Sequence, residues 1–537
     1  MLLLDHLGKA DADDDWNALA DIVRYFVRRN GALISNPVPV SACDLRPPPK
    51  GTSTAGDPRL ADERRQEICA KASSNDNKDR RERMTGPSRI TASVIVIALV
   101  AGVAAAFAIA WRPAIAAIDP PAPRSFDKAL VSRGRDLAAI GNCNDCHTVR
   151  GARNFAGGLP VPTPFGTIYS SNITPDPETG IGRWPEAAFR RAMRSGVDRE
   201  GQHLYPTFPY DHFTNVSDED DRALYAFLMT RQPVHAPARA NELSFPLDQR
   251  PVIAGWKLLF LRRDTYRPDT AKSAEWNRGA YLVEGLAHCG ACHTPRNALG
   301  AERMSAQFAG GEVDNWHAYA INDKSHSPVP WDADALYAYL RHGWHPDHGT
   351  ARGPMAEVVS NLSEVADSDV RAIAIYMADI SGAVTPERKR QGEAALAQAK
   401  MPATQVLPQH ATGASIYAAA CASCHETGKP LPYGGVNLAL STAISSPDPR
   451  NLANIVLSGV RPVEGERSPI MPGFAASMND EQAAALLNYL RSRFSNQPAW
   501  SGVEKTVQDA RRTETVFLQT SAGPRDPPAD PTQRGKP

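Results

Sequence analysis

Three short motifs of cysteine and histidine carry the chemistry that this chain can perform. Six of its eight cysteines lie in three copies of the pattern Cys-x-x-Cys-His, which are Cys143-Asn-Asp-Cys146-His147, Cys289-Gly-Ala-Cys292-His293 and Cys421-Ala-Ser-Cys424-His425. At the Cys and His frequencies of this chain, one such pentad is expected by chance roughly 0.003 times. Three copies of the pentad therefore cannot be a chance occurrence, and a common function is expected of them.

The pentad is the attachment signature of c-type haem. Its two thiols lie one helical turn apart and form bonds to the two vinyl groups of the porphyrin, while the adjacent histidine binds the iron. A zinc ribbon would need the pentads in pairs to complete four ligands, and three leave one over. A thioredoxin-like pair would follow a strand and open a helix, and the flanking sequences lack that pattern. We therefore predict three covalently attached haem c groups, with their irons bound by His147, His293 and His425.

A haem that only transfers electrons usually has a second protein ligand, and a methionine opposite the histidine raises its potential. Such a methionine is expected on a loop beyond the pentad. Met355 in a Gly-Pro-Met segment and Met471 in a Met-Pro-Gly-Phe segment fit the second and third haem groups. The alternative role for a methionine is core packing. Because both lie in segments rich in proline and glycine, ligation is the prediction.

The first repeat departs from this pattern. Its equivalent loop has Phe208 where a methionine would be expected, and phenylalanine cannot bind iron. The nearby candidates are His212, Met193 and His203. Met193 lies in a helical pattern typical of packing, and His203 follows a turn. We predict His212 as the ligand, since imidazole is a common alternative to methionine and would lower the potential of this haem.

The elements that must position these residues recur three times. A helix opening near a glycine is expected before each pentad, and a second helix with a polar start and an aromatic residue near its end is expected far downstream. The glycines are Gly134, Gly279 and Gly413, and the aromatic residues are Phe227, Tyr376 and Tyr489. Two such helices packed over a haem are the plan of a class I cytochrome c. The sequence thus predicts a mainly α protein with three tandem cytochrome c domains at 126–235, 270–382 and 408–495.

The remaining segments differ in composition. With 59 basic and 59 acidic side chains among 537 residues, the chain has no basic surplus to favour nucleic acid. Residues 90–111 form an uncharged apolar run with basic residues before it, which predicts a transmembrane anchor with the haem domains exported. A cleaved signal peptide is the alternative. Residues 1–83 fit poorly before such a segment, so Met84 is our hypothesis for the true start. The tail at 501–537 is expected to be disordered.

Residues 126–495 resemble the multihaem cytochrome c subunits of membrane-bound bacterial dehydrogenases, which include alcohol and gluconate dehydrogenases. The resemblance is carried by the three pentads and by PFGTIYSSNITPDPETGIGRW at 164–184, although that family commonly has methionine in place of Phe208. The second repeat, with TARGPMAEVV at 350–359, is more similar to the cytochromes that accompany molybdenum hydroxylases such as nicotinate or aldehyde dehydrogenases.

The chain has no nucleotide-binding fingerprint, no H-E-x-x-H and no nucleophile elbow, so no catalytic site of its own is evident. The resemblance implies an electron-transfer subunit in the bacterial inner membrane, with its haem domains in the periplasm. Its partner would be a dehydrogenase with molybdenum and iron–sulfur centres, and its acceptor quinone or a terminal oxidase. One alternative is a quinoprotein alcohol or flavoprotein gluconate dehydrogenase as partner. Another is a stand-alone haem enzyme with an open first iron.

Overall fold

The computed structural model describes Ile97, Gly102 and residues 109–382, 384–399, 408–426, 436–461 and 469–520. The extension 1–83 lies outside the described residues, as does the predicted span 90–111 except for Ile97, Gly102 and 109–111. Within the described ranges, no helix has the length and apolar character needed to cross a bilayer. The chain divides into two compact units, 1–104 and 105–537, and all elements below belong to the second.

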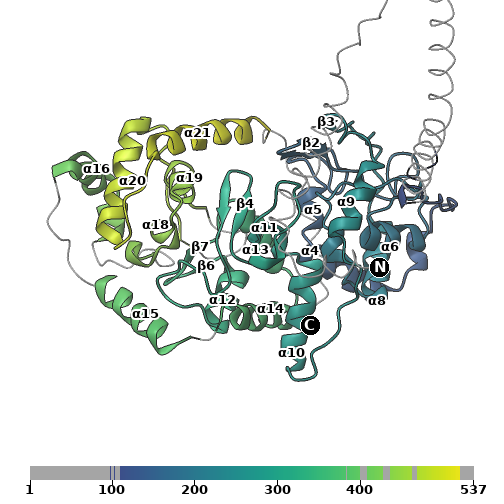
Figure 1. Cartoon of the computed structure of the whole chain (residues 1–537), viewed down its shortest axis with the longest axis horizontal. Coiled ribbons are helices and arrows are strands. Elements are labelled where there is room, and N and C mark those ends of the chain that lie inside the picture. Colours follow the sequence, from purple (N-terminus) through teal and green to yellow (C-terminus); the bar gives the residue numbers. More distant parts are fainter. Residues whose placement is uncertain are drawn as a thin grey trace, which may run out of the picture. The chain divides into compact units, whose positions relative to one another are not determined.

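The described part is mainly helical, and six of its helices form three crossing pairs. The pairs are α4 (Lys128–Ile140) with α8 (Asp218–Met229), α10 (Ala274–Tyr281) with α14 (Asp367–Ile380), and α16 (Ala411–Ala420) with α20 (Asp480–Phe494) (Figure 1). In each pair one helix precedes a pentad and the other lies far downstream, as the repeat predicts. Polar residues start two of the downstream helices: Ser217 caps α8, and Asn479 forms a capping box with Gln482 at α20.

Each pair crosses at a glycine. A Cβ added to Gly134, Gly279 or Gly413 would lie 1.9, 1.9 or 2.2 Å from a backbone oxygen of the partner helix. The same Cβ would lie 2.7 to 2.8 Å from the Cβ of Phe227, Tyr376 or Tyr489, the aromatic residues of the repeat. The expectation that each helix opens near its glycine is wrong for Gly134 and Gly279, which lie well inside α4 and α10, whereas Gly413 lies in the first turn of α16, as expected. In all three pairs the glycine lies where the two backbones come closest.

The other described elements are helices of four to eighteen residues and small antiparallel sheets, most of which lie between the paired helices along the chain. The other α-helices are α5 (Cys143–Cys146), α6 (Glu186–Ser195), α7 (Tyr210–Phe213), α9 (Val252–Phe260), α11 (Gly290–His293), α12 (Ala333–His342), α13 (Pro354–Leu362), α15 (Pro386–Ala399), α17 (Ala422–His425), α18 (Thr442–Ser445), α19 (Arg450–Ser458) and α21 (Val503–Thr520). The sheets are β1 (Pro160–Thr163), β2 (Gly166–Tyr169) and β3 (Glu242–Leu243), then β4 (Gly311–Val313) with β5 (Trp316–Ala318), and β6 (Trp344–His345) with β7 (Gly349–Thr350). A π-helical turn, η2 (Leu282–Leu286), follows α10.

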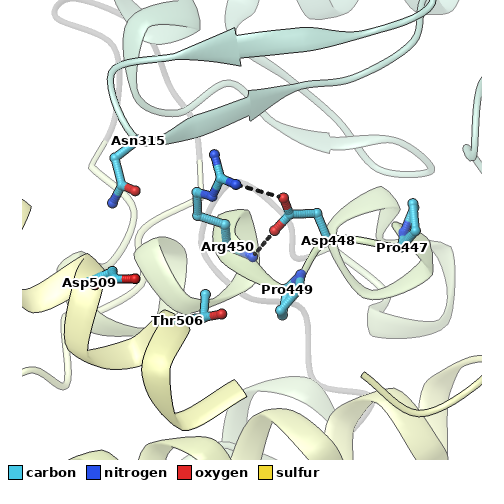
Figure 2. A pocket seen from close by; sticks show the side chains of 7 residues that line it. All are labelled: Asn315, Pro447, Asp448, Pro449, Arg450, Thr506 and Asp509. Carbon is cyan, nitrogen blue, oxygen red and sulfur yellow. Dashed lines mark hydrogen bonds and ion pairs between the residues drawn. The ribbon is translucent and has the colours of Figure 1, made fainter. Parts of the chain in front are cut away.

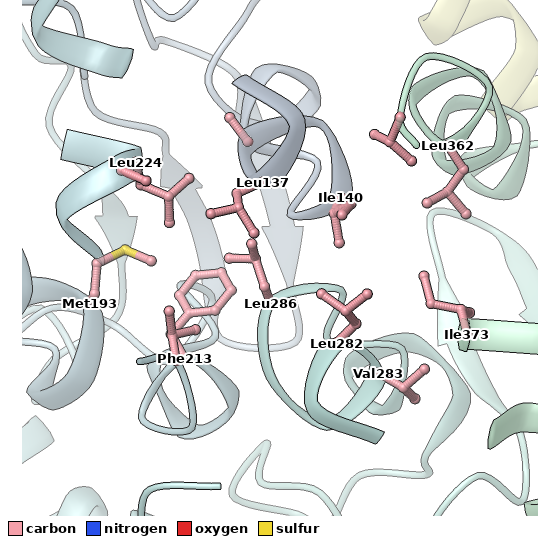
Figure 3. Packing of buried hydrophobic residues seen from close by; sticks show 14 of the residues in the cluster. Leu137, Ile140, Met193, Phe213, Leu224, Leu282, Val283, Leu286, Leu362 and Ile373 are labelled. Carbon is pink, nitrogen blue, oxygen red and sulfur yellow. The ribbon is translucent and has the colours of Figure 1, made fainter. Parts of the chain in front are cut away.

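The first two helix pairs share one hydrophobic core. Leu137 of α4 lies against Leu286 of η2, and the same cluster continues to Leu362 of α13 and Ile373 of α14 (Figure 3). Leu286 also approaches Gly141, at the end of α4, to 3.1 Å from an added Cβ. The regions predicted as two separate domains are therefore joined by apolar packing.

The third helix pair has a core of its own. It contains Tyr417 of α16 and Leu487 of α20, and α19 and α21 pack against them. Helix α21 corrects the prediction of a disordered tail for its first part: Val503, Val507 and Ala510 are buried in this core. Their spacing of four and three residues is the helical pattern that the tail's polar composition masked.

Candidate functional site

The three pentads fold alike. Each forms a one-turn helix, in which the backbone N–H of the histidine donates to the carbonyl of the first cysteine, over 3.1 Å for His147 and 3.0 Å for His293 and His425. This turn places the two sulfurs of each pentad on one side and the imidazole directly after them. The structure therefore gives all three pentads the local geometry that attachment to one porphyrin requires.

The first two histidines are oriented by backbone carbonyls. Nδ1 of His147 donates to the carbonyl of Ser171 over 2.7 Å, and Nδ1 of His293 donates to that of Tyr319 over 2.7 Å. Nε2 is thereby left as the nitrogen with a lone pair for iron. Nδ1 of His425 has no hydrogen-bond partner of normal geometry among the described residues, but the backbone of Val436 lies near enough to raise the pKa of this histidine against the effect of burial. The motif search did not find these carbonyls, since a backbone acceptor leaves no mark on residue type.

The protonation states fit a covalently held haem. Burial lowers the pKa of all three pentad histidines, which favours the neutral imidazole that binds iron. Burial also raises the pKa of the thiols of Cys143 and Cys289 to about 12. The thiolate that zinc binding or thiol–disulfide exchange needs is therefore disfavoured, whereas a thioether carries no charge. The donor set present fits haem c.

The first and second pentads lie close together. Burial, then the charges of Asp145 and Cys292, raise the pKa of the Cys146 thiol to about 11. Helix α13 of the second repeat reaches the first pentad directly. Its Asn361 donates from Nδ2 to Asn142 over 2.9 Å and to Asp145 over 2.7 Å. Charges and hydrogen bonds thus connect the first pentad to the second repeat, which is far from it in the sequence.

Met355 lies at the opposite end of α13. The expectation that it lies in a loop is wrong, because Gly353 turns the chain at φ +58° and Pro354 then starts the helix. Met355 is partly buried against the shared core. One helix of nine residues therefore holds the predicted ligand of the second iron at its start and the contact with the first pentad, through Asn361, near its end.

Met471 lies outside the helices, on a loop as predicted, and forms an isolated β-bridge with Val460. Its N–H donates to Val460 over 3.0 Å and its carbonyl accepts from Val460 over 2.8 Å. Its partly buried side chain packs against the third core, as Cys421 does. The structure thus brings Met471 to the same core as the third pentad.

His212 is differently placed. It is buried, its Nδ1 bonds to the carbonyl of Glu284 over 3.1 Å, and its Nε2 bonds to Glu302 over 2.8 Å. Although burial opposes protonation, the hydrogen bond and charge of Glu302 raise the pKa of His212 to about 9. Both nitrogens therefore donate, and neither offers a lone pair to iron. His212 packs against Gly290 of the second pentad, 3.0 Å from an added Cβ.

The two other candidates for the first iron are also engaged. His203 is buried, with Nε2 bonded to the carbonyl of Ala110 over 2.9 Å and Nδ1 bonded to Lys257 over 3.1 Å. Met193 is buried in the shared core, in agreement with the expectation of packing. No contact among the described residues identifies a sixth ligand for the first haem.

Tyr319 connects the second repeat to the third. Its carbonyl accepts a hydrogen bond from Nδ1 of His293, while its side chain packs against the third core. The neighbouring hairpin is held by Asn451 of α19, which accepts from the N–H of His317 over 2.9 Å and donates to the carbonyl of the same residue over 2.8 Å. Asn454, one turn later, donates to the tip of the hairpin over 3.0 Å.

A polar pocket of about 650 Å³ lies beside this contact. Figure 2 shows Arg450 paired with Asp448 on its floor, with Asn315 of the hairpin opposite and Asp509 of α21 alongside. Arg450 also pairs with Glu312 of β4. None of the predicted haem ligands lines this pocket, so we interpret it as part of the polar contact between the second repeat and the third.

Comparison with known proteins agrees with this geometry. Residues 408–490 match the family model of cytochrome c oxidase, cbb3-type, subunit III. Over 426 residues, the chain is 35% identical to the fructose dehydrogenase cytochrome subunit of Gluconobacter japonicus, covering 75% of this chain and 87% of that protein. It is 36% identical to the gluconate 2-dehydrogenase cytochrome c subunit of Pantoea cypripedii, covering 72% and 91%. It is 47% identical to a nicotinate dehydrogenase subunit of Pseudomonas putida, covering 76% of this chain but 34% of that longer protein.

Proposed function

Since this chain belongs to the family of cytochrome c subunits of bacterial dehydrogenases, with covalently bound haem c, we propose that it conducts electrons from a catalytic dehydrogenase subunit through three haem groups to the respiratory chain. The observation that carries the proposal is the series of three pentads, linked by α13 between the first and second and by Tyr319 between the second and third.

The residues that would hold each group follow from the site. The paired cysteines of each pentad attach the porphyrin, and His147, His293 and His425 bind the irons. Met355 and Met471 are our proposed second ligands of the second and third irons. Each bound iron takes up and releases one electron by alternating between its ferric and ferrous forms.

The protein's own contribution is orientation and spacing. The carbonyls of Ser171 and Tyr319 hold two imidazoles in the tautomer that presents Nε2 to iron. Asn361 holds α13 against the first pentad, and Asn451 holds the hairpin that leads into Tyr319. These bonds fix the separation of neighbouring groups, on which the rate of electron transfer depends.

We further propose that the catalytic partner carries molybdenum and iron–sulfur centres. The similarity of residues 350–359 to cytochromes of molybdenum hydroxylases supports this, as does the 47% identity to a nicotinate dehydrogenase subunit. A quinoprotein or flavoprotein partner is the alternative. The three relatives are all dehydrogenase subunits, which favours electron transfer over a stand-alone haem enzyme. The apolar run at 90–111 supports an inner-membrane anchor with the haem groups in the periplasm and quinone or a terminal oxidase as acceptor.

The test is purification of the full chain in mild detergent, with haem counting and cofactor analysis of what accompanies it. We expect three haem groups per chain, and loss of one third of the haem absorbance when both cysteines of any one pentad are replaced by alanine. Met304→Ala, at an exposed sulfur-containing residue outside the pentads, is the control and should leave the count unchanged. Molybdenum in the complex would support a molybdenum hydroxylase as the partner. Pyrroloquinoline quinone or flavin would instead assign the partner as a quinoprotein or flavoprotein dehydrogenase.

A further inference from the structure

Helix α9 buries its charged side chain and exposes leucine side chains, the reverse of an ordinary surface helix. Its charged residue, Lys257, is buried and bonds through Nζ to the carbonyls of Ser195 and Gly196. Burial lowers the pKa of this amine to about 7. Meanwhile Leu258 and Leu259 are 65% and 68% exposed. A soluble surface normally hides leucine and exposes lysine, so this helix needs an apolar surrounding on its outer side.

The apolar surface extends to both sides of these leucines. Val252 at the start of the helix is 40% exposed, and Phe245, in the segment that leads into it, is 82% exposed. Gly255, on the same outer side, has no atom within 4 Å of an added Cβ, so no part of the described chain covers the helix there.

Two cations follow the helix. Arg262 and Arg263 are exposed, and neither forms an ion pair within the described ranges. Apolar side chains beside exposed arginines match the interface of an anionic bilayer, where the leucines enter the acyl region and the guanidinium groups meet phosphate.

Hydrogen bonds connect α9 to the end of the predicted membrane span. His203 bonds to Lys257 of α9 through Nδ1 and to the carbonyl of Ala110 through Nε2. Ala110 is the penultimate residue of the apolar run at 90–111, and the next residue, Trp111, is 57% exposed. Tryptophan is typical of the membrane interface. A helix fixed this close to the exit of a span lies within reach of the lipid surface.

We propose that the outer face of α9, formed by Val252, Leu258, Leu259 and the adjoining Arg262 and Arg263, lies in the head-group region of the membrane and binds anionic phospholipid. The inference rests on the proposed membrane anchor and adds a second, lateral contact. It holds the first haem unit against the bilayer, where a lipid-soluble electron acceptor diffuses.

The test is photo-crosslinking from α9 in the full-length chain. A benzophenone amino acid replaces Leu259, and the protein is reconstituted in vesicles of phosphatidylcholine with or without phosphatidylglycerol. The matched control carries the same amino acid at Val384, an exposed apolar position outside α9 that is 48% exposed. We expect a phospholipid adduct from position 259 and none from position 384. The yield should rise with phosphatidylglycerol and fall in the R262E/R263E variant.

Two results would overturn the inference. A protein adduct at position 259 in native membranes would assign the face to a partner subunit, and absence of any adduct would leave it in solvent. Haem content and reduction by a chemical donor are measured on the same samples. If they are normal while the lipid adduct is missing, the membrane contact fails and the proposed electron transfer stands.

Discussion

The first two helix pairs and the third are joined in different ways. Between the first two, Leu137, Leu286 and Leu362 form one continuous apolar core. The third pair closes around a separate core and meets the second repeat through asparagine amides and an arginine, apart from the ring of Tyr319. Separating two regions that share one apolar core exposes that core to water, at a large cost in free energy, whereas polar groups freed from a contact form hydrogen bonds to water instead. The first two repeats should therefore unfold as one body and the third repeat as another.

The largest effect is expected at the glycine crossings. Replacing Gly279 by valine places a branched side chain where even a Cβ would lie 1.9 Å from a backbone oxygen, so α10 and α14 must separate at a cost above about 3 kcal/mol. Loss of the haem absorbance of both the first and second units is the expected outcome. Gly413→Val should affect only the third. Gly255→Ala, whose added methyl meets nothing, is the control and should not destabilise the protein. Independent loss of the second haem in Gly279→Val would contradict a shared core.

A smaller effect follows from truncating Leu286. This side chain is fully buried where the two units meet, so Leu286→Ala should lower the free energy of unfolding by about 3 kcal/mol. Guanidinium titration followed at the haem bands should move the transition of the first and second haem groups together. The same change at Leu487, equally buried in the third core, should move only the third transition. Identical responses to both variants would show that the whole chain unfolds as one body.

Acid should also distinguish the two regions. Burial, with a smaller contribution from His345, lowers the pKa of His348 to about 3, and its ring stacks on Trp331 at 3.5 Å. Between about pH 6.5 and pH 3 the unfolded chain binds a proton that the folded chain does not, so stability falls as pH falls through this window. The loss at pH 4.5 is roughly 2–3 kcal/mol.

The described part of the third core has no buried histidine outside its pentad, so its transition should respond less to acid. His348→Phe keeps the ring stack and should reduce the acid sensitivity of the first region, measured as the difference between denaturation midpoints at pH 7 and pH 4.5. If acid shifts the denaturation midpoint of the third repeat more than that of the first two, His348 is not the main source of the acid sensitivity.

The smallest effect concerns the polar contact itself. Asn451→Ala leaves the N–H and carbonyl of His317 without partners, at a cost of about 1–2 kcal/mol. We expect slower reduction of the third haem by the second in stopped-flow measurements, with both unfolding transitions retained. Asn479→Ala is the matched control, because it removes the exposed N-terminal cap of α20 and should destabilise the third helix pair without changing the transfer rate. If the rate of electron transfer is unchanged in Asn451→Ala, the contact between Asn451 and His317 does not contribute to electron transfer.

Sequence patterns predicted the repeated parts well, because each repeat imposes the same demand on residue type. Only glycine fits where α4 and α8 cross, which explains why Gly134 recurs in the repeat, although the sequence does not predict its contact with Phe227. The joining of the first two units could not be predicted in this way. Leu286 would suit any buried helix, and nothing in its sequence context shows that its neighbour is Leu137 of another repeat.

The ligand predictions show a second limit. Met355 was recognised by its Gly-Pro context, yet that context starts a helix. For His212, residue type suggested a ligand, while its bonds depend on Glu302, ninety residues further along the chain. The hydrogen-bond partner of a histidine depends on tertiary structure, which cannot be derived from a single sequence.

The bond from Asn361 to the first pentad constrains how the protein matures. Asn142 and Asp145 are covered by a side chain that lies 219 residues further along the chain than Asn142. The machinery that joins porphyrin to the first pair of thiols needs that segment accessible. Cofactor insertion at the first pentad should therefore come before α13 closes over it, and premature folding of the second repeat would trap a chain with its first site empty. The order of the pentads along the chain suits this sequence of events, because a polypeptide made from its amino terminus presents Cys143 first.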